Sequence, residues 1–514
     1  MHKVTNKLAA GLHKLQRSAE SNIPHRSEPL NSQQSIYRFR KQRGVNLGSW
    51  FVLERWITDA PFRYAAAPAQ SDLDVARGQH AKETLEAHYD SWITESDWSW
   101  ICDRGLNTVR IPIGYYHLCG ADPSVLEGTD FKDLGHVFSG AWLRLINAIE
   151  TAQRFGLGVL LDLHAAPGKQ NNDSHAGTPM PPTFFSDHRN RTHTIHVLRT
   201  LIVHLNNYSP PLLNIVGIEL LNEPQPPSDS VLKDWYSIAI KDLATLDRNL
   251  PIYLGDCWRT EQYADYIKST PHSSLLVLDH HLYRCFTSSD ISTPAPDHTR
   301  SLTDESAHTS RMFSRVAEKL SSAGGGLVVG EWSGALNPGS ITGAPDEVKN
   351  YVAAQLSLYE KHCAGYFFWT YKKLGLRPDR GWCLRDAVDG GIFPSRVGLL
   401  ATRRADGDRE RQVSARDELK EKALGEHTAY WSKYPGRYQH SRFADGFAVG
   451  WDDAYMFFAS SSSLDRAVSE LGFVGAWSKN RTEDHGSSFW EFQHGFNQGV
   501  VAARSDFRQH YCFD

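Results

Sequence analysis

Short, almost continuously apolar runs, separated by longer amphipathic stretches, place the strongest constraint on the fold of this chain. Such runs are typical of strands buried on both faces, and their alternation with helical patterns indicates βα units around a parallel sheet. From residue 43 onward there are eight of them, at 44–47, 106–111, 158–164, 215–222, 251–255, 274–281, 327–331 and 365–369. Eight βα units predict a closed (β/α)8 TIM barrel in the α/β class.

The 514 residues are enough for such a barrel and an additional segment at each end. We predict an N-terminal extension over 1–36, whose second half is a linker, the barrel over 37–400, and a helical C-terminal appendage over 401–514. The extension carries Leu8, Leu12 and Leu15 at helical spacing among basic residues. This pattern fits a mitochondrial presequence or a membrane-surface helix, but a docking helix or frayed extension is the simpler interpretation.

The predicted appendage contains a sequence motif that occurs twice. Residues 443–450 and 492–499 both follow the pattern F-x-x-G-F-x-x-G. Residues four apart share one face of a helix, and glycines on that face let another element approach closely. We therefore expect two closely packed helices that serve as a scaffold.

Composition narrows the functional class. The formal charge of −4 comes without a long basic block, which argues against nucleic acid as a partner, and no stretch has the length of a transmembrane helix. The seven cysteines include no C-x-x-C pair, which argues against a cysteine metal cluster or a full disulfide framework. Without a recognisable secretory signal, we expect a cytoplasmic protein.

Polar or aromatic residues stand at the ends of six predicted strands, where TIM barrels place their chemistry. They are Arg110, His164, Asn222, Glu223, His281, Tyr283, Glu331 and Trp369. Glu223 lies in G-I-E-L-L-N-E-P and Glu331 in L-V-V-G-E-W-S. Two carboxyl groups at this edge can divide one reaction between an acid and a nucleophile, as in retaining glycosidases.

Several segments resemble the exo-β-1,3-glucanase branch of glycoside hydrolase family 5. These are 43–58, 107–114, 162–164, 221–224, 330–332 and 382–387, and the resemblance covers about residues 40 to 400. It implies hydrolysis of terminal β-D-glucosyl linkages with retention, in β-1,3-glucan, a small β-glucoside or a glycolipid. It implies no metal or other cofactor.

The resemblance also implies roles for individual residues. Glu223 would be the general acid/base and Glu331 the nucleophile, with their carboxyl groups roughly 5 Å apart. Arg110 would lower the pKa of Glu331 and keep it ionised, and Tyr283 would donate a hydrogen bond to it. Glu223 would have a raised pKa and hold its proton for the leaving oxygen.

The remaining implied residues contact the sugar. Asn222 would bond the 2-hydroxyl, Glu54 the terminal sugar, and Trp369 would form an apolar platform. His164 and His281 would orient the substrate or the acid/base. Purely structural alternatives are a salt bridge of Glu54 with Arg55, a barrel-end ion pair of Arg110, and core packing of the histidines and the tryptophan.

The chain departs from the family in the loop after His164. Asp173, Ser174 and His175 stand where the exo-glucanases usually have an aromatic residue and an Asp-Asn pair. Because this loop shapes the outer pocket, small β-glucosides and glycolipids are alternatives to β-1,3-glucan. Two other functional classes stay open: a catalytically inactive glycan-binding or scaffold protein, and a metal-dependent enzyme built on His280 and His281.

Overall fold

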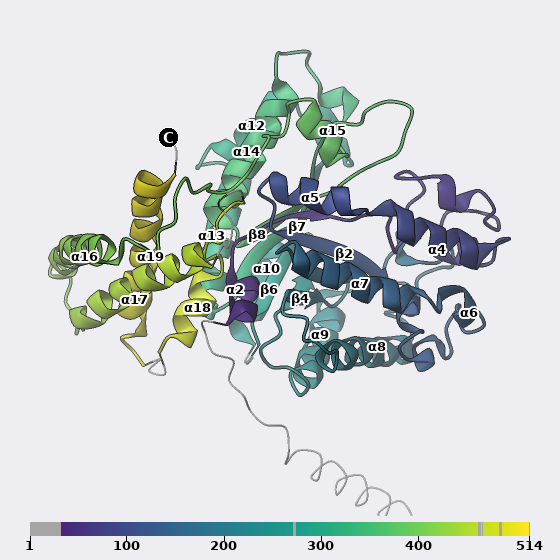
Figure 1. Cartoon of the computed structure of the whole chain (residues 1–514), viewed down its shortest axis with the longest axis horizontal. Helices are drawn as coiled ribbons and strands as arrows, with labels where there is room; N and C mark the ends of the chain where they lie inside the picture. The colour runs from purple at the N-terminus through teal and green to yellow at the C-terminus, as the bar shows by residue number, and fades with distance from the viewer. Residues whose placement is uncertain (1–31, 271–273, 461–463, 465, 483–485, 513–514) are drawn as a thin grey trace, which may run out of the picture.

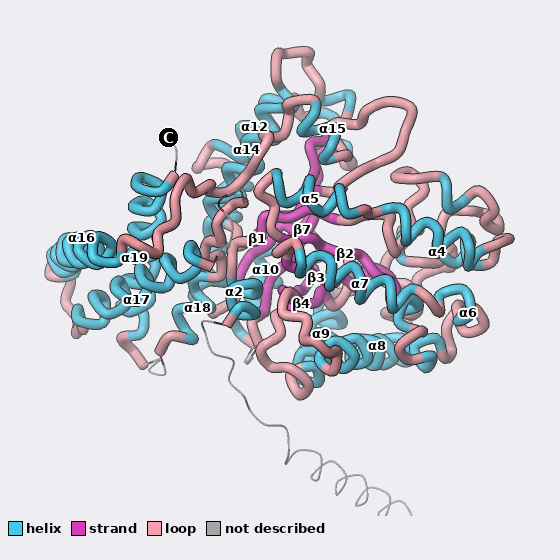
Figure 2. The backbone as a smooth tube through the Cα atoms, in the orientation of Figure 1, coloured by secondary structure: helices cyan, strands magenta, loops and turns pink. Residues whose placement is uncertain are grey.

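The computed structural model describes residues 32–270, 274–460, 464, 466–482 and 486–512. Eight parallel strands close into a barrel in chain order, with helices around it (Figures 1 and 2). The strands are β1 Gln42–Asn46, β2 Thr108–Gly114, β3 Gly158–Ala165, β4 Ile215–Glu219, β5 Ile252–Gly255, β6 Leu276–Arg284, β7 Gly326–Leu336 and β8 Gly365–Phe368. Each predicted run overlaps one strand, so the predicted TIM barrel is confirmed.

The strand ends near the two glutamates differ from the prediction. β4 stops at Glu219, and residues 220–223 leave the strand because Glu223 has a φ of 42° and the following proline carries no N–H for a ladder. β7 continues past Glu331, and its register against β8 shifts between Val329 and Trp332. Such a register shift changes the direction in which the neighbouring side chains point. An apolar run in the sequence does not reveal where the shift occurs.

Amphipathic helices connect the strands, and Thr94 and Asp97 form the predicted capping box before α5. The helices up to residue 400 are α2 Gln33–Phe39, α3 Asp72–Ala76, α4 Ala81–Trp92, α5 Glu95–Asp103, α6 Gly135–Phe138, α7 Ala141–Arg154, α8 His188–Asn206, α9 Asp229–Leu243, α10 Thr260–Ser269, α11 Ser288–Ser292, α12 Ala295–Thr303, α13 His308–Ala323, α14 Glu347–His362 and α15 Leu384–Asp389. Among the described helices none is both long and apolar enough to cross a membrane.

The appendage consists of α16 Arg409–Trp431, α17 His440–Ala459, α18 Val474–Asn480 and α19 Phe489–Tyr511. The repeated motif lies on α17 and α19, which run side by side (Figure 1). A Cβ on Gly446 would lie 2.0 Å from the carbonyl oxygen of Phe492, and one on Gly495 would lie 2.0 Å from that of Phe443. The predicted close approach at glycine is therefore confirmed, and each copy of the motif contacts the other.

The appendage covers the amino-terminal end of the barrel. Leu160, Val216 and Val277, near the starts of β3, β4 and β6, form one apolar cluster with Phe39 of α2 and Trp477 of α18. Residues 33–36, expected to be linker, are instead the first turn of α2: the Ser32 side chain caps this turn, and Ile36 packs into the apolar cluster. The leucines at 8, 12 and 15 lie outside the described residues. The carboxyl ends of the strands are left open.

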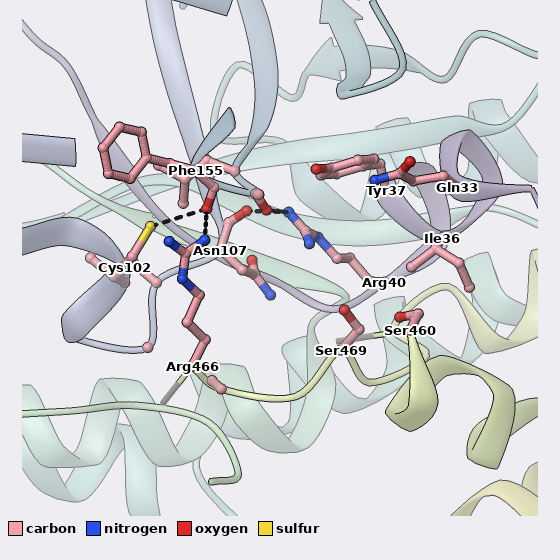
Figure 3. A pocket seen from close by; sticks show the side chains of 15 residues that line it. Gln33, Ile36, Tyr37, Arg40, Cys102, Asn107, Phe155, Ser460, Arg466 and Ser469 are labelled. Atoms are coloured by element: carbon pink, nitrogen blue, oxygen red, sulfur yellow. Dashed lines mark hydrogen bonds between the residues drawn. The ribbon is translucent and has the colours of Figure 1, made fainter. Parts of the chain in front are cut away.

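Figure 3 shows a cavity of about 350 Å³ at the joint between barrel and appendage. The Arg40 guanidinium donates to the carbonyl oxygen of Gly156 at 3.2 Å, and Arg466 of the appendage donates to that of Phe155. Both carbonyls lie just past the C-terminal end of α7, where positive groups complement unpaired carbonyls. Arg466 therefore joins the appendage to the barrel, while Arg40 ties the end of α2 to the same turn.

Candidate active site

A cavity of about 740 Å³ lies at the carboxyl ends of the strands. It is lined by Glu54, Trp56, His164, Asp173, His175, Glu223, Trp258, Tyr283, Phe286, Thr287, Asp290, Glu331, Trp369 and Trp382. Six of the nine predicted site residues are in this lining. The other three, Arg110, Asn222 and His281, are buried beneath it and contact lining residues.

The two glutamates face each other at the base of the cavity. One carboxylate oxygen of Glu223, one of Glu331 and a ring nitrogen of His281 all lie within 4.8 Å of one another. The Nδ1 atom of His281 is 2.8 Å from Oε1 of Glu223 and 3.5 Å from Oε2 of Glu331. Carboxyl groups at this separation suit formation of a glycosyl-enzyme, since they leave no room for a water between acid and base.

Glu331 is held by the two donors predicted for it. Arg110 donates from Nη1 to Oε1 at 2.9 Å, and the Tyr283 hydroxyl donates to Oε2 at 2.8 Å. Arg110 acts to lower the pKa of Glu331, as expected, but it does not decide the net value. Burial raises the pKa of Glu331 to about 7, although His281 and Arg110 both act to lower it.

Arg110 compensates Glu331 only in part because it is shared among several carboxylates. It donates to Glu219 at 2.9 Å and pairs with Asp162 at 3.0 Å, and all these side chains are buried. The positive charge is thus divided, and burial also raises the pKa of Asp162, to about 7. Sequence reasoning missed Glu219 and Asp162, although a carboxylate inside an apolar strand run was the available signal.

Glu223 is suited to hold a proton. Burial, together with the charge of Asp173, raises its pKa to about 8. Glu331 therefore loses its proton at lower pH than Glu223, in the predicted order. Burial also lowers the pKa of His281, so the ring between the two carboxyl groups favours the neutral form.

The predicted sugar-contacting groups surround the glutamates. His164 is fixed by a 2.6 Å contact from Nδ1 to Asp162, and its ring lies 5.8 Å from that of Trp369, with parallel planes. Asn222 accepts from Arg110 at 2.8 Å through its Oδ1, and its Nδ2 lies 3.5 Å from Nε2 of His164. The amide donor is thereby turned toward the histidine beside the cavity.

Glu54 closes another side of the cavity. It accepts a 2.7 Å hydrogen bond from the Trp56 indole, and burial raises its pKa to about 8. Arg55 pairs instead with Asp59 at 2.6 Å, so the alternative of a Glu54–Arg55 salt bridge is not what the structure shows. The carboxyl group of Glu54 is therefore directed to the lining of the cavity.

The two further histidines, His175 and His280, have different surroundings. His175 lines the cavity, with its ring 4.8 Å from that of His164. His280 instead contacts Asp256 at 2.7 Å, whereas its neighbour His281 contacts Glu223. Residues 280 and 281 thus have different partners and do not converge on one metal position.

The sequence analysis did not predict the group of aromatic side chains at the opening of the cavity, which is called the aromatic mouth below. The rings of Phe286 and Trp382 are 5.9 Å apart, and Tyr283 lies 5.4 Å from Trp382. Trp56 and Trp258 are also partly exposed here. Trp382 lay in a segment of the family resemblance, but the loop residues Trp258 and Phe286 had no local pattern that would have placed them.

Comparison with known proteins agrees with this geometry. The sequence model for cellulase (glycosyl hydrolase family 5) matches residues 76–375. The chain belongs to glycosyl hydrolase family 5, as predicted, and is a glycoside hydrolase. A second model, the glucan 1,3-beta-glucosidase 3 C-terminal domain, matches residues 412–507, within the appendage.

Relatives match over nearly the whole chain. Glucan 1,3-beta-glucosidase 3 of Schizosaccharomyces pombe is 29% identical over 481 residues, covering 91% of this chain and 96% of the relative. The uncharacterized glycosyl hydrolase YBR056W of Saccharomyces cerevisiae is 31% identical over 494 residues, covering 91% of each. The rutinosidase structure from Aspergillus niger aligns with a TM-score of 0.56 at 19% identity, over 70% of this chain and 99% of that one, and shares the fold.

Proposed function

We propose that this family 5 hydrolase is a retaining, exo-acting β-glucosidase that releases terminal glucosyl units from β-1,3-glucan or related β-glucosides. The observation that carries the proposal is the opposed pair of glutamates, whose carboxylate oxygens lie within 4.8 Å at the base of one cavity. The Schizosaccharomyces pombe relative is a glucan 1,3-beta-glucosidase by name, which supports the choice of a β-1,3-glucan.

The reaction would proceed in two displacements. Ionised Glu331 attacks the anomeric carbon and forms an ester with the sugar, while Glu223 transfers its proton to the departing glycosidic oxygen. Glu223 then takes a proton from a water molecule, whose oxygen attacks the anomeric carbon and returns the bonding electrons to Glu331. The raised pKa of Glu223 keeps the proton needed for the first step.

The hydrogen-bond donors around Glu331 would stabilise its negative charge. Arg110 and Tyr283 contact both oxygens of Glu331, so they stabilise the carboxylate before attack and after its release. Because Arg110 occupies Oδ1 of Asn222, the Nδ2 donor is the end of the amide that a sugar 2-hydroxyl would meet. Glu54 and Trp369 would bind the terminal sugar, and Trp382 with Phe286 would contact the leaving group.

The aromatic mouth of the cavity also suits an apolar aglycone, because aromatic rings pack against both sugar faces and hydrocarbons. A glycolipid is therefore the second candidate substrate. Laminari-oligosaccharides and a steryl glucoside should be assayed side by side, and the anomer of the first product recorded by NMR. β-Glucose as the first product from either substrate would support retention, whereas α-glucose would refute it.

Substitution assigns the two roles. Glu331→Gln should remove nearly all turnover of an aryl β-glucoside, because no group remains to form the ester. Glu223→Ala should retain turnover of substrates with good leaving groups and, with azide added, form β-glucosyl azide. The exposed Glu318→Gln is the matched control. Undiminished activity in Glu331→Gln would overturn the proposal, and glycan binding without hydrolysis by the unmodified protein would indicate an inactive binding protein.

A further inference from the structure

Three helices of the appendage bring two histidines and a glutamate together. His427 of α16, His440 at the start of α17 and Glu491 of α19 are far apart in the sequence, and Figure 1 shows the three helices side by side. Oε2 of Glu491 lies 3.2 Å from Nε2 of His427 and 3.1 Å from Nδ1 of His440. All three atoms lie within 4.8 Å of one another.

These distances are close to those of a tetrahedral zinc site. With zinc–nitrogen and zinc–oxygen bonds of roughly 2.0–2.2 Å, neighbouring ligand atoms stand about 3.3–3.6 Å apart. The two contacts of Glu491 are shorter than this by only a few tenths of an ångström. Imidazole nitrogens and a carboxylate oxygen are also a donor set that zinc prefers.

A further histidine stands one turn along α19. Glu491 and His494 have the E-x-x-H spacing, which projects both side chains from the same face of a helix. The His494 ring lies 5.4 Å from that of His427. Its Nε2 lies 3.0 Å from Nε2 of Gln498, so His494 would have to leave this contact to become a fourth ligand.

The setting points to a structural role for this cluster. His427 is the only fully buried residue in the 23-residue helix α16. The helix is also attached through Leu419, which packs on the appendage core, and through Arg411, which pairs with Asp506. The side chain of Glu491 is fully buried. Phe443 stacks on the His427 ring at 4.2 Å, giving the apolar surroundings that commonly enclose metal sites.

We propose that the appendage holds a structural zinc ion, with His427, His440, Glu491 and His494 as its ligands. The ion would pin α16 to α17 and α19. The site lies on the appendage, which covers the end of the barrel opposite the catalytic glutamates. The proposal is therefore independent of the proposed activity.

The first measurement is the zinc content of the untagged full-length protein by inductively coupled plasma mass spectrometry. We expect about one zinc ion per chain. Thermal unfolding should shift to lower temperature after treatment with EDTA and recover with added ZnCl2, because a ligand that binds only the folded state stabilises it. No zinc binding at micromolar free zinc, with an unfolding midpoint indifferent to both reagents, would overturn the proposal and leave a hydrogen-bonded His-Glu-His cluster.

Variants locate the ion. His427→Gln with His440→Gln should abolish zinc binding, whereas the matched pair His193→Gln and His196→Gln on α8 should retain it. If the first pair fails to fold, the partly exposed His494→Gln is used alone and should weaken zinc binding at least tenfold. Retention of full zinc affinity in these variants would overturn the assignment.

The catalytic centre holds three other groups that could bind zinc, and the group of Glu223, His281 and Glu331 is the one that contains both catalytic glutamates. Glu331→Gln should leave the zinc content unchanged if the ion is in the appendage. Loss of zinc in that variant would move the ion to the catalytic site and refute the proposal. Activity is not the readout, so failure of the proposed hydrolysis and failure of the zinc site are distinguishable.

Discussion

Tyr283→Phe tests how Glu331 is held. The hydroxyl donates to Oε2 of Glu331 at 2.8 Å, while the ring packs 5.4 Å from Trp382 and 5.6 Å from Phe286. Phenylalanine retains the ring contacts and removes only the donor. Arg110 continues to bond Oε1, so the carboxylate stays in place but loses one of its two donors.

The expected effect follows from where negative charge develops. During attack the charge leaves Glu331, so the hydroxyl stabilises the reactant at least as much as the transition state and its loss does not slow this step. During hydrolysis of the glycosyl-enzyme the charge returns, and the donor stabilises that transition state. A hydrogen bond to a charged group contributes about 1.5–3 kcal/mol, which corresponds to a roughly 10- to 150-fold slower second step.

The assay is pre-steady-state hydrolysis of an aryl β-glucoside with a good leaving group. Tyr283→Phe should show a burst of released phenol followed by a slow steady rate, with kcat reduced more than kcat/KM. Tyr455→Phe, which removes a hydroxyl donated to Asp506 in the appendage, is the control. A fall in kcat/KM with an unchanged kcat and no burst would show that the hydroxyl positions substrate and does not stabilise the departing carboxylate.

Three other substitutions test separate parts of the structure. Asp173→Asn removes a charge that raises the pKa of Glu223, so the alkaline limb of the kcat/KM–pH profile, near pH 8, should move to lower pH. The acid limb near pH 7, which is set by Glu331, should stay where it is. An unmoved alkaline limb would contradict this reasoning. Phe286→Ala should raise KM for laminari-oligosaccharides several-fold, and equal KM values would exclude a contact with the leaving group. Gly446→Ala should lower the free energy of unfolding, measured in urea, by about 1–3 kcal/mol, because the new Cβ would meet the Phe492 carbonyl. Gly425→Ala on α16 is the control: its Cβ would point into open space, so it should not destabilise the protein.

The barrel could be predicted because each strand carries its own local signature. The run ending in Val329 and Gly330 is apolar regardless of what surrounds it, and so are its seven counterparts. The two glutamates could be placed because each follows such a run, and barrel topology brings strand ends to one edge. What this reasoning could not provide was the backbone detail, such as the positive φ of Glu223 and the register shift beside Glu331.

Features that depend on distant contacts were not predictable. Phe286 and Trp258 lie on loops, where hydrophobic periodicity carries no information about direction. His427 and Glu491 are separated by 64 residues and meet because α16 packs against α17 and α19. The zinc proposal thus rests on tertiary packing that the F-x-x-G-F-x-x-G motif only suggested.

The pKa of Glu331 shows why the ionisable groups of a site have to be treated together. A single arginine beside a single carboxylate would lower the pKa of the acid, which was the sequence-based reasoning. In the structure Arg110 also contacts Glu219 and Asp162, and all four side chains are removed from water. One positive charge cannot compensate three buried carboxylates, so protons are retained among them. The ionisation of the nucleophile is therefore set by how the acids share Arg110. The pKa of Glu223 is the higher of the two because burial and the charge of Asp173 both raise it, whereas His281 and Arg110 lower the pKa of Glu331.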